Sequence, residues 1–378
     1  MNILMLNYEF PPIGGGAGKV HLNILREYSK QNDLNIDVLT SAPQPPNQII
    51  KLYDNINIHK VGVHKKNLHF WRKIEILEWL VKAGVYYKKL IKSKKYDIVH
   101  SFFGFPTGWF CYKSRKKIPY IISLRGSDVP GKNLRFAFEY KLLGLAFKAI
   151  WKNASCLVAC SEGLKQRALR FYPQVKIEVI PNGVDIEKFY PISENRTKKS
   201  DLIRLITVGR LSITKRVNIL TDAVKILVGQ GKNVKLLVVG GGSLKDSLEK
   251  TAARKNLSNY IEFRGIVDSE QMPQFYQNSD LYVSATMQEG MSNAMLEAMA
   301  CGLPIITTPC EGVDELIKGN GVIVKKETAG GIAKAISELV MNTEKLESMS
   351  KAARKHAENF TWKSISQTYL NFYQKILS

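Results

Sequence analysis

Short apolar runs alternate with helical patterns along this chain, and the alternation limits the possible folds more than any other feature of the sequence. In the first half, apolar residues at helical spacing over 17–31, 72–93, 135–153 and 162–171 separate the runs. The runs themselves are Ile3–Leu6, Ile36–Thr40, Ile98–Ser101, Tyr120–Leu124, Cys156–Ala159 and Ile177–Ile180. Such alternation is typical of a parallel β-sheet with helices on both faces. The sequence therefore predicts an α/β fold for this half.

The alternation stops once and then begins again. Residues 191–200 are polar and show no periodicity, which indicates a linker between domains. After it come a helical face from Val217 to Val228 and a second series of apolar runs, Leu205–Val208, Leu236–Val239, Tyr260–Phe263, Leu281–Ser284 and Ile305–Thr307. A chain of 378 residues is also long for a single domain. We therefore expect two α/β domains, over 1–190 and 201–361.

The segment 284–304 contains two acidic residues, Glu289 and Glu297, around the predicted start of a helix. The pattern of the segment predicts a strand end, a glycine turn, and a short helix that ends at a Gly-Leu-Pro sequence. Ser292 or Asn293 can cap the helix start, so Glu289 precedes the helix and Glu297 lies about one turn inside it.

The start of this helix is a candidate anion site. Its first backbone N–H groups have no partner within the helix, and the helix dipole adds to their attraction for negative charge. The residues that would surround the anion are Gly290, Met291, Ser292 and Asn293. A diphosphate bound there would have one carboxylate near each end. Because a nucleotide sugar places a hexose and a ribose on either side of its diphosphate, the segment predicts a site for such a molecule.

This segment resembles the signature of the large family of retaining glycosyltransferases with the GT-B fold, family four, the group 1 glycosyl transferases. In that family the first glutamate contacts the donor sugar and the second binds the ribose hydroxyls, which implies these roles for Glu289 and Glu297. The resemblance also implies two Rossmann-like domains that face each other across a cleft. Domain 1–190 would bind the acceptor and domain 201–361 the nucleotide sugar, with the last helix, 362–378, packing back on the first domain. The resemblance covers nearly the whole chain.

A basic loop opens the second domain. Arg210 follows a predicted strand and Lys215 precedes the next helix, so both side chains can reach the carboxyl ends of the strands, where open α/β sheets bind ligands. They match the family's Arg and Lys that hold the donor phosphates. There they would stabilise the departing nucleotide diphosphate, whose charge grows in the transition state. For Arg216 two interpretations stay open, a part in this site and an ordinary solvated basic residue.

Three further segments are candidates for the donor side. In the glycine loop 11–18, Gly15 and Gly16 let a ligand approach the backbone at a helix start, although the loop forms no Gly-x-Gly-x-x-Gly motif and a plain tight turn is the alternative. Gly241 lies in a later strand-to-helix turn, with a structural and a ligand-binding interpretation both open. Arg264 lies in a stretch, Arg264-Gly265 with Val267, that resembles the family's segment against the nucleobase.

The sequence departs from the family pattern at Arg125. Many members carry a histidine there, next to the reacting sugar, and an arginine cannot act as a base because it stays protonated. Asp128 is retained and could accept the acceptor's proton or orient its hydroxyl group. His100, at the end of a predicted strand, is a further acceptor-side candidate, with a buried core histidine as the alternative interpretation.

Neither a metal nor a cofactor is expected. The chain contains no Asp-x-Asp motif, whereas metal-dependent transferases use carboxylates to hold a divalent ion on the diphosphate. Arg210, Lys215 and the helix start would take over that role. The five cysteines form no Cys-x-x-Cys pair, which argues against a zinc site or a disulfide framework.

Positive charge is concentrated in the first domain. The net charge is +22, and residues 1–190 contain 30 lysines and arginines against 14 acidic residues, a net charge of +16. Basic and aromatic residues, including Trp71 and Trp79, mix over 65–95 as they do in segments that bind anionic lipid; a solvated helix is the alternative. No apolar run approaches the roughly 18 residues of a membrane span, and the start does not resemble a signal peptide. We expect a cytoplasmic protein associated peripherally with the inner face of the cell membrane.

Together these patterns favour transfer of a hexose from a nucleotide diphosphate sugar to a glycan or lipid-linked acceptor in surface polysaccharide biosynthesis. The resemblance suggests a UDP-sugar, with GDP-mannose as the alternative donor. A sugar-nucleotide epimerase or phosphorylase on the same architecture is the main rival. A basic nucleic-acid-binding protein is a remote one, because no recognised nucleic-acid module appears, and we expect no nucleic-acid partner.

Overall fold

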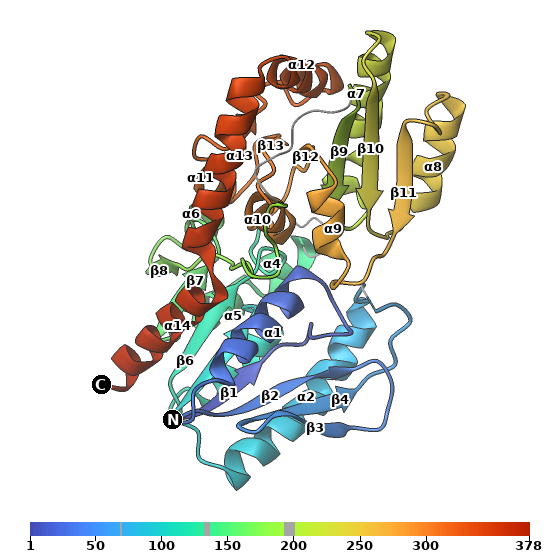
Figure 1. Cartoon of the computed structure of the whole chain (residues 1–378). Helices are drawn as coiled ribbons and strands as arrows, with labels where there is room; N and C mark the ends of the chain where they lie inside the picture. Colours follow the sequence, from blue (N-terminus) through green and yellow to red (C-terminus); the bar gives the residue numbers. More distant parts are fainter. Residues whose placement is uncertain (69, 132–136, 193–200) are drawn as a thin grey trace. The chain divides into compact units, whose positions relative to one another are not determined.

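The computed structural model describes residues 1–68, 70–131, 137–192 and 201–378 (Figure 1). They form two compact units, each with its own sheet. Unit 1 consists of Met1–Asn182 and Trp362–Ser378, and unit 2 of Gly183–Thr361. Most of the predicted linker 191–200 and the start of the helix predicted over 135–153 lie outside the described residues.

The sheet of unit 1 has eight strands in the order β3-β4-β2-β1-β5-β6-β7-β8. Their bounds are β1 Asn2–Leu6, β2 Asn35–Ala42, β3 Gln48–Tyr53, β4 Ile56–Gly62, β5 Ile98–Phe102, β6 Tyr120–Leu124, β7 Cys156–Ala159 and β8 Ile177–Val179. Neighbouring strands pair in parallel except β3 with β4. The central strands β5 and β6 are buried along their whole length, as expected for strands covered on both faces. The predicted α/β fold is thus confirmed for this unit.

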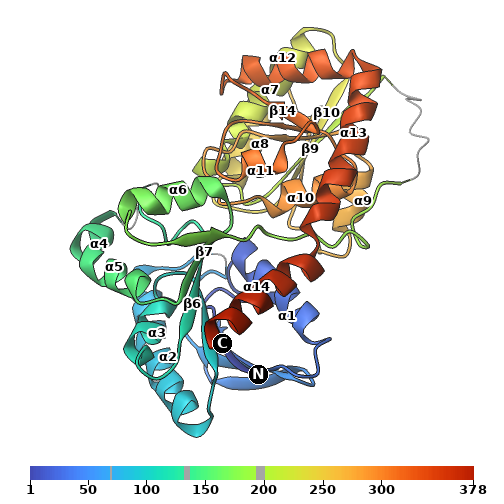
Figure 2. The same ribbon diagram turned by 90° about the vertical axis from the view of Figure 1, so that its left-hand side faces the viewer.

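Helices cover both faces of this sheet. They are α1 Gly16–Tyr28, α2 Lys73–Ser93, α3 Thr107–Ser114, α4 Ala137–Leu142, α5 Gly144–Lys152, α6 Glu162–Phe171 and α14 Trp362–Leu377. Helices α2, α3 and α5 lie on one face, and α1 packs beside α14 on the other (Figure 2). The single helix predicted over 135–153 is wrong, because α4 ends at Leu142 and α5 begins at Gly144. Glycine is a weak helix former, which accounts for the break.

The two tryptophans that suggested a lipid surface lie in the core of unit 1. Trp71 and Trp79 are buried, and the ring of Tyr8 lies 5.1 Å and 6.0 Å from theirs. The ammonium group of Lys65 lies 3.8 Å from the centre of the Trp71 ring. The expectation that these two rings contact lipid is therefore wrong, because their apolar surface is used inside the fold.

Unit 2 has a six-stranded sheet in the order β11-β10-β9-β12-β13-β14, with all neighbours parallel. Its strands are β9 Ile203–Val208, β10 Val234–Val239, β11 Ile261–Gly265, β12 Leu281–Ser284, β13 Ile305–Thr307 and β14 Gly321–Ile323. Its helices are α7 Val217–Gly229, α8 Lys245–Arg254, α9 Met272–Gln277, α10 Asn293–Ala300, α11 Val313–Leu316, α12 Ala329–Val340 and α13 Thr343–Ala357. Short 3-10 turns occupy Ile213–Lys215 and Glu358–Phe360. The core of the unit joins β9 and β10 to α7 and α12 through residues such as Leu205, Leu236, Leu220 and Ile336.

Among the described helices, none combines the length and the apolar character needed to cross a membrane.

Candidate functional site

The strand order of unit 2 reverses its direction between β9 and β12. From β9 the sheet continues through β10 and β11 on one side, and through β12, β13 and β14 on the other. Open parallel sheets bind ligands outside the carboxyl ends of the strands at such a switch point. The loop after β9 carries Arg210 and Lys215, and the loop after β12 carries Glu289. The topology therefore places three residues predicted from the sequence at the same edge of the sheet.

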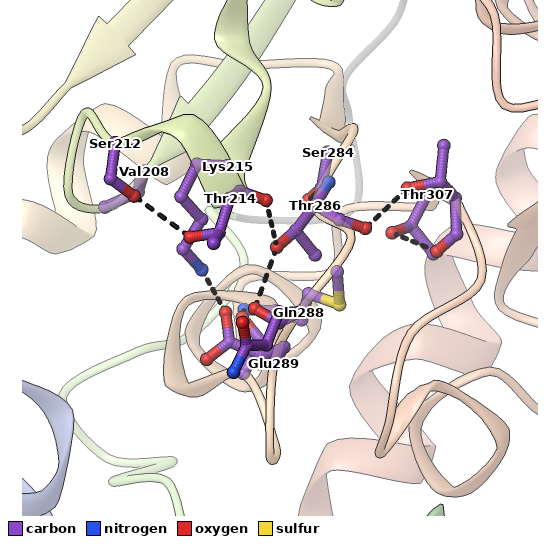
Figure 3. Close-up of polar contacts among 12 residues, drawn as sticks. Val208, Ser212, Thr214, Lys215, Ser284, Thr286, Gln288, Glu289 and Thr307 are labelled. Carbon is purple, nitrogen blue, oxygen red and sulfur yellow. Dashed lines mark hydrogen bonds and ion pairs between the residues drawn. The ribbon is translucent and has the colours of Figure 1, made fainter. Parts of the chain in front are cut away.

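Lys215 and Glu289 are in direct contact at this edge. The ammonium group of Lys215 forms an ion pair with Oε2 of Glu289 (Figure 3). The two side chains are 25% and 22% exposed, so the pair is partly shielded but open to a ligand. Because an ammonium group has three donors, Lys215 can bind a second anion while it contacts Glu289.

Hydrogen bonds around Thr214 hold the two loops together. The carbonyl oxygen of Thr214 accepts from the backbone N–H of Met287 at 3.0 Å and from the hydroxyl of Thr286 at 3.3 Å. The hydroxyl of Thr308, directly after β13, donates to the carbonyl oxygen of Thr286 at 2.8 Å. Figure 3 shows the side chains of Thr214 and Thr286 beside the Lys215–Glu289 pair. The position of Lys215 is thus set by hydrogen bonds that join the loops after β9, β12 and β13.

Arg216 has a bracing role. Its Nε donates to the carbonyl oxygen of Ala285 at 2.6 Å, and its Nη2 lies 3.3 Å from the hydroxyl of Thr308. The same Nη2 forms an ion pair with Glu327 at 2.6 Å. Arg216 also has a left-handed backbone, with φ of +47°, at the start of α7. Arg216 is therefore not an ordinary solvated residue, because its guanidinium joins the loops after β12 and β13 to residue 327.

Ser292 caps the helix that lies between the two glutamates. Its side chain accepts from the backbone N–H of Met295 at 3.3 Å, and α10 begins at Asn293. Of the two predicted caps, the structure thus selects Ser292. Gly290 and Met291 form the turn that precedes it, with Met291 buried. The first turn of α10 has no acidic side chain, so no side chain of that turn opposes an anion at the helix start.

Glu297 lies in α10 and is held by a tyrosine. The hydroxyl of Tyr276, from α9, donates to Oε2 of Glu297 at 2.8 Å. Burial and the nearby charge of Glu297 raise the pKa of Tyr276 well above its ordinary value, so this hydroxyl remains a donor. Burial and then the charges of Glu289 and Glu297 raise the pKa of Tyr282 in β12. Its hydroxyl donates to the carbonyl oxygen of Val208 at 3.4 Å.

The glycine turn after β10 packs directly on the loop that carries Arg210. The backbone of Gly240, at φ +136°, lies against the carbonyl oxygen of Gly209, and Gly242, at φ +157°, lies against that of Leu211. A Cβ atom at either position would overlap these oxygens. Gly241 contributes its carbonyl oxygen, which accepts from the backbone N–H of Leu211 at 2.9 Å. The glycines at 240 and 242 are therefore required for close packing, and the turn sets the position of the basic loop.

Two candidate cations are exposed. Arg210 lies two residues beyond β9, and its side chain forms no hydrogen bond or ion pair with the other described residues. Arg264 lies near the carboxyl end of β11, with its guanidinium carbon 5.8 Å from the centre of the Phe275 ring. Both are therefore on the side of the sheet predicted to bind a ligand.

Unit 1 has its own switch point, between β1 and β5. The loop after β1 leads into α1, whose cap is Gly15 and whose first residue, Gly16, is exposed. The first turn of α1 has no acidic residue and Gly15 supplies no capping side chain, which suits the approach of an anion. The structure thus places Gly15 and Gly16 as the sequence predicts, at a helix start beside a switch point.

Asp128 holds the loop after β6. Its carboxylate accepts backbone N–H groups from Gly104 at 2.7 Å, Arg125 at 2.8 Å and Gly126 at 3.0 Å. The residue is only 9% exposed, and burial raises the pKa of its carboxyl group. Three N–H partners and this burial make Asp128 an anchor for the backbone of Arg125, a contact that the sequence did not indicate.

The guanidinium of Arg125 is held by neutral groups. Nη1 donates to Oδ1 of Asn182 at 3.0 Å, Nη2 donates to the hydroxyl of Tyr369 at 3.3 Å, and the guanidinium carbon lies 4.7 Å from the centre of the Phe102 ring. Arg125 is half-buried. Its position is therefore fixed by the end of β5, by α14 and by Asn182.

His100 is a core residue in this structure. Nδ1 lies 2.5 Å from the hydroxyl of Tyr373 and Nε2 lies 2.8 Å from that of Ser123, and no part of the ring is exposed. Burial lowers the pKa of His100 well below its ordinary value. A ring that is enclosed and bonded at both nitrogens cannot contact an acceptor, which favours the core alternative over the acceptor-side one.

Several residues around these sites carried no signal in the sequence. Tyr276 and Tyr282 lie in segments typical of core residues, and the hydrogen bond from Tyr276 to Glu297 joins two separate helices. His21 stacks on Phe102 at 4.2 Å in the core of unit 1, again without a spacing that would reveal it. Within the part of the chain that the structure describes, no three His, Cys, Asp or Glu side chains gather as metal ligands would.

Comparison with protein families finds two matches that together span most of the chain. Residues 14–188 match the model described as Glycosyltransferase Family 4, and residues 190–356 match Glycosyl transferases group 1. An uncharacterized glycosyltransferase of Methanocaldococcus jannaschii is 27% identical over 384 residues, covering 100% of this chain and 99% of the relative. The capsular polysaccharide biosynthesis glycosyltransferase CapM of Staphylococcus aureus is 29% identical over 255 residues, 62% of this chain and 66% of the relative.

Solved structures share the fold. Sucrose-phosphate synthase of Thermosynechococcus elongatus superposes with a TM-score of 0.83 at 20% identity, covering 99% of this chain and 98% of the other. Anabaena HepE, solved in complex with UDP-glucose, gives a TM-score of 0.76 at 19% identity, covering 99% and 100% of the two chains.

Proposed function

This chain belongs to the group 1 glycosyl transferases with the GT-B fold, and we propose that it transfers a hexose from a nucleotide diphosphate sugar, preferably a UDP-sugar, to a glycan or glycolipid. The observation that carries the proposal is the contact between Lys215 and Glu289 at the switch point of unit 2, with Glu297 nearby on α10. A phosphate-binding cation and a sugar-binding carboxylate side by side fit the junction between diphosphate and hexose.

Each residue of unit 2 then has a role in donor binding. Lys215 and Arg210 hold the diphosphate, together with backbone N–H groups at the start of α10 around Gly290. Glu289 binds hydroxyl groups of the hexose. Glu297, fixed by Tyr276, binds the ribose hydroxyls.

The leaving group is stabilised by these cations, with no metal required. Negative charge grows on the diphosphate as the bond to the hexose breaks, and fixed cations stabilise the transition state more than the ground state. We propose retention of configuration through front-side displacement, in which the leaving phosphate takes the proton of the acceptor hydroxyl. Unit 1 would bind the acceptor, with Gly15 and Gly16 approaching the donor phosphates.

The acceptor is proposed to be a glycan or lipid-linked glycan at the inner face of the cell membrane, in the synthesis of a surface polysaccharide. The names of relatives support this, since CapM acts in capsular polysaccharide biosynthesis and TuaC of Bacillus subtilis is a putative teichuronic acid glycosyltransferase. The net charge of +16 in residues 1–190 suits an anionic surface. HepE in complex with UDP-glucose supports the choice of a UDP-sugar.

Two measurements test the proposal. Calorimetry of UDP, GDP and ADP with the purified protein should show binding of UDP, and strong binding of GDP without UDP would overturn the choice of donor. The anomeric configuration of the product, read by NMR, should equal that of the donor and should be formed in the presence of EDTA. Conversion of the sugar nucleotide without an acceptor product would instead indicate an epimerase.

Replacement of the cations gives a second line of test. Arg210→Ala and Lys215→Ala should each lower turnover by roughly 10²–10³, as for a lost transition-state donor. Glu297→Ala should mainly weaken nucleotide binding. Near-normal turnover in both cation variants would show that they do not hold the diphosphate.

A further inference from the structure

Helix α2 presents apolar side chains to solvent along one line. Ile74, Leu77, Val81 and Val85 are between 60% and 69% exposed, although the helix buries an opposite face against the sheet. Their spacing of three or four residues places them on one side of the helix. Large apolar side chains that gather on one exposed helix face mark a surface that contacts another protein or a membrane.

The same line continues as lysines in the second half of the helix. Lys88 and Lys92 follow Val85 at spacings of three and four residues, and Lys89 lies beside them. All three are exposed, and none of them forms an ion pair with any described residue. With Val85 and Ser93 they line an open hollow of about 470 Å³ on the surface. Cations that gather around a hollow without acidic partners attract an anionic group.

A second exposed apolar group lies at the other end of α2. Lys73, the first residue of α2, forms an ion pair with Glu139 of α4. On α4 and at the start of α5, Phe138, Leu142 and Leu145 are all more than two-thirds exposed. Figure 2 shows α2, α4 and α5 along the same side of unit 1. The exposed apolar surface therefore extends from α2 across this ion pair.

We propose that this surface, the α2 face, docks on an anionic lipid bilayer. The apolar residues from Ile74 to Val85 enter the interface between headgroups and acyl chains, and Lys88, Lys89 and Lys92 bind lipid phosphates at the hollow. An interfacial helix needs these two parts together, an apolar face and unpaired cations beside it. Charge complementarity selects a lipid surface over a second copy of this chain, because two copies would bring six unpaired lysines together. The inference rests on the proposed acceptor at the membrane face. It places the lipid contact on exposed side chains of α2, whereas Trp71 and Trp79 are buried.

Sedimentation of the full-length protein with vesicles tests the proposal. Wild type should bind vesicles of phosphatidylcholine mixed with phosphatidylglycerol, bind less at high salt, and bind vesicles of pure phosphatidylcholine poorly. Replacing Lys88, Lys89 and Lys92 by Gln should lower the partition coefficient on the order of 100-fold, since each of the three cations near an anionic surface contributes a factor of about five. Leu77→Ser with Val81→Ser should lower it on the order of tenfold.

Matched controls separate the α2 face from general charge and hydrophobicity. Lys225, Lys345 and Lys351 are exposed in unit 2, and their joint replacement by Gln changes the net charge equally but should leave vesicle binding unchanged. Met341→Ser, which removes an apolar side chain that is also exposed in unit 2, should likewise have no effect. Equal losses of vesicle binding in the control variants and in the α2 variants would overturn the proposal.

Two further outcomes would also refute the proposal that the α2 face docks on lipid. One is that wild type binds neither kind of vesicle. The other is that Val81→Ser abolishes a dimer seen by analytical ultracentrifugation, which would make the α2 face a contact between two copies of the chain. UDP calorimetry on the same samples keeps the two proposals apart. A protein that binds UDP but no vesicles refutes only the α2 face, and one that binds vesicles but no nucleotide refutes only the proposed donor.

Discussion

Glu289→Gln should strengthen the binding of UDP while it weakens catalysis. UDP has the diphosphate that Lys215 is proposed to hold but lacks the hexose proposed for Glu289. In the structure Glu289 takes one of the three donors of the Lys215 ammonium group and places a negative charge beside the proposed phosphate site. Removing the charge but keeping the shape weakens the competition for the ammonium group and relieves the repulsion between the carboxylate and the phosphate. The same change removes a contact to the hexose, so turnover should fall.

The size of the effect follows from the partial exposure of the pair. With side chains 25% and 22% exposed, solvent screens the interaction, and such pairs contribute about 0.2–1 kcal/mol. UDP should therefore bind Glu289→Gln about 1.5–5-fold more tightly, since 1.4 kcal/mol corresponds to a factor of ten. Replicate titration calorimetry with UDP measures this change.

Two controls make the measurement decisive. Glu327→Gln changes the charge of unit 2 equally but removes the partner of Arg216 rather than that of Lys215, so it should leave the affinity for UDP nearly unchanged. In a Lys215→Met background, the gain from Glu289→Gln should shrink, because there is no ammonium group left to free. Unchanged or weaker UDP binding in Glu289→Gln alone would refute competition between carboxylate and phosphate for Lys215.

Three further predictions concern stability. Burial lowers the pKa of His21 to about 3 and that of His100 well below its ordinary value, so between pH 6.5 and 3 the unfolded chain binds more protons than the folded one. The free energy of unfolding should therefore fall by about 1.4 kcal/mol per pH unit for each histidine below pH 6.5, and urea titrations at pH 7.5 and 5.5 should show a smaller fall in His21→Phe. Gly242→Ala should destabilise the protein by about 1–3 kcal/mol, because the new Cβ meets the carbonyl oxygen of Leu211. The control Gly330→Ala, in α12 with open space around it, should be neutral or stabilise the protein by up to about 1 kcal/mol. Equal shifts of the thermal unfolding midpoint in the two variants would contradict this prediction. Asp128→Asn should cost about 1–3 kcal/mol, since an amide group cannot accept from all three backbone N–H groups, and an unchanged midpoint of urea unfolding would argue against its anchoring role.

The sequence predicted the parts of the fold that depend on local patterns. Buried parallel strands such as β5 and β6 appear as continuous apolar runs, and the cap of α10 appears as a serine before a helix. Strand β3 was missed because it is an exposed edge strand without a buried face. The break between α4 and α5 was missed because apolar periodicity continues through Gly144, and only the low helix propensity of glycine indicates it.

Contacts between distant segments were beyond the reach of sequence patterns. Glu289 and Glu297 were found because both lie around one helix start, whereas Tyr276 reaches Glu297 from a separate helix. The residue types of Trp71 and Lys65 suggested a surface segment. In the structure the ammonium group of Lys65 lies over the buried indole ring of Trp71. Aromatic and basic residues have the same composition in a core cation–π contact and on a lipid surface, so only burial separates the two.

The contacts of the candidate bases in unit 1 indicate which group takes the proton of the acceptor hydroxyl. Arg125 stays protonated, and His100 is enclosed with both nitrogens bonded. The carboxylate of Asp128 is the strongest remaining candidate, but it accepts three backbone N–H groups and would have to release them to approach a substrate. Under the proposed function, the leaving diphosphate is then the most accessible base, because it gains negative charge as the sugar departs. This reasoning predicts that Asp128→Asn loses stability without changing the pH at which kcat is half-maximal, whereas a general base at this position would shift or abolish that pH dependence.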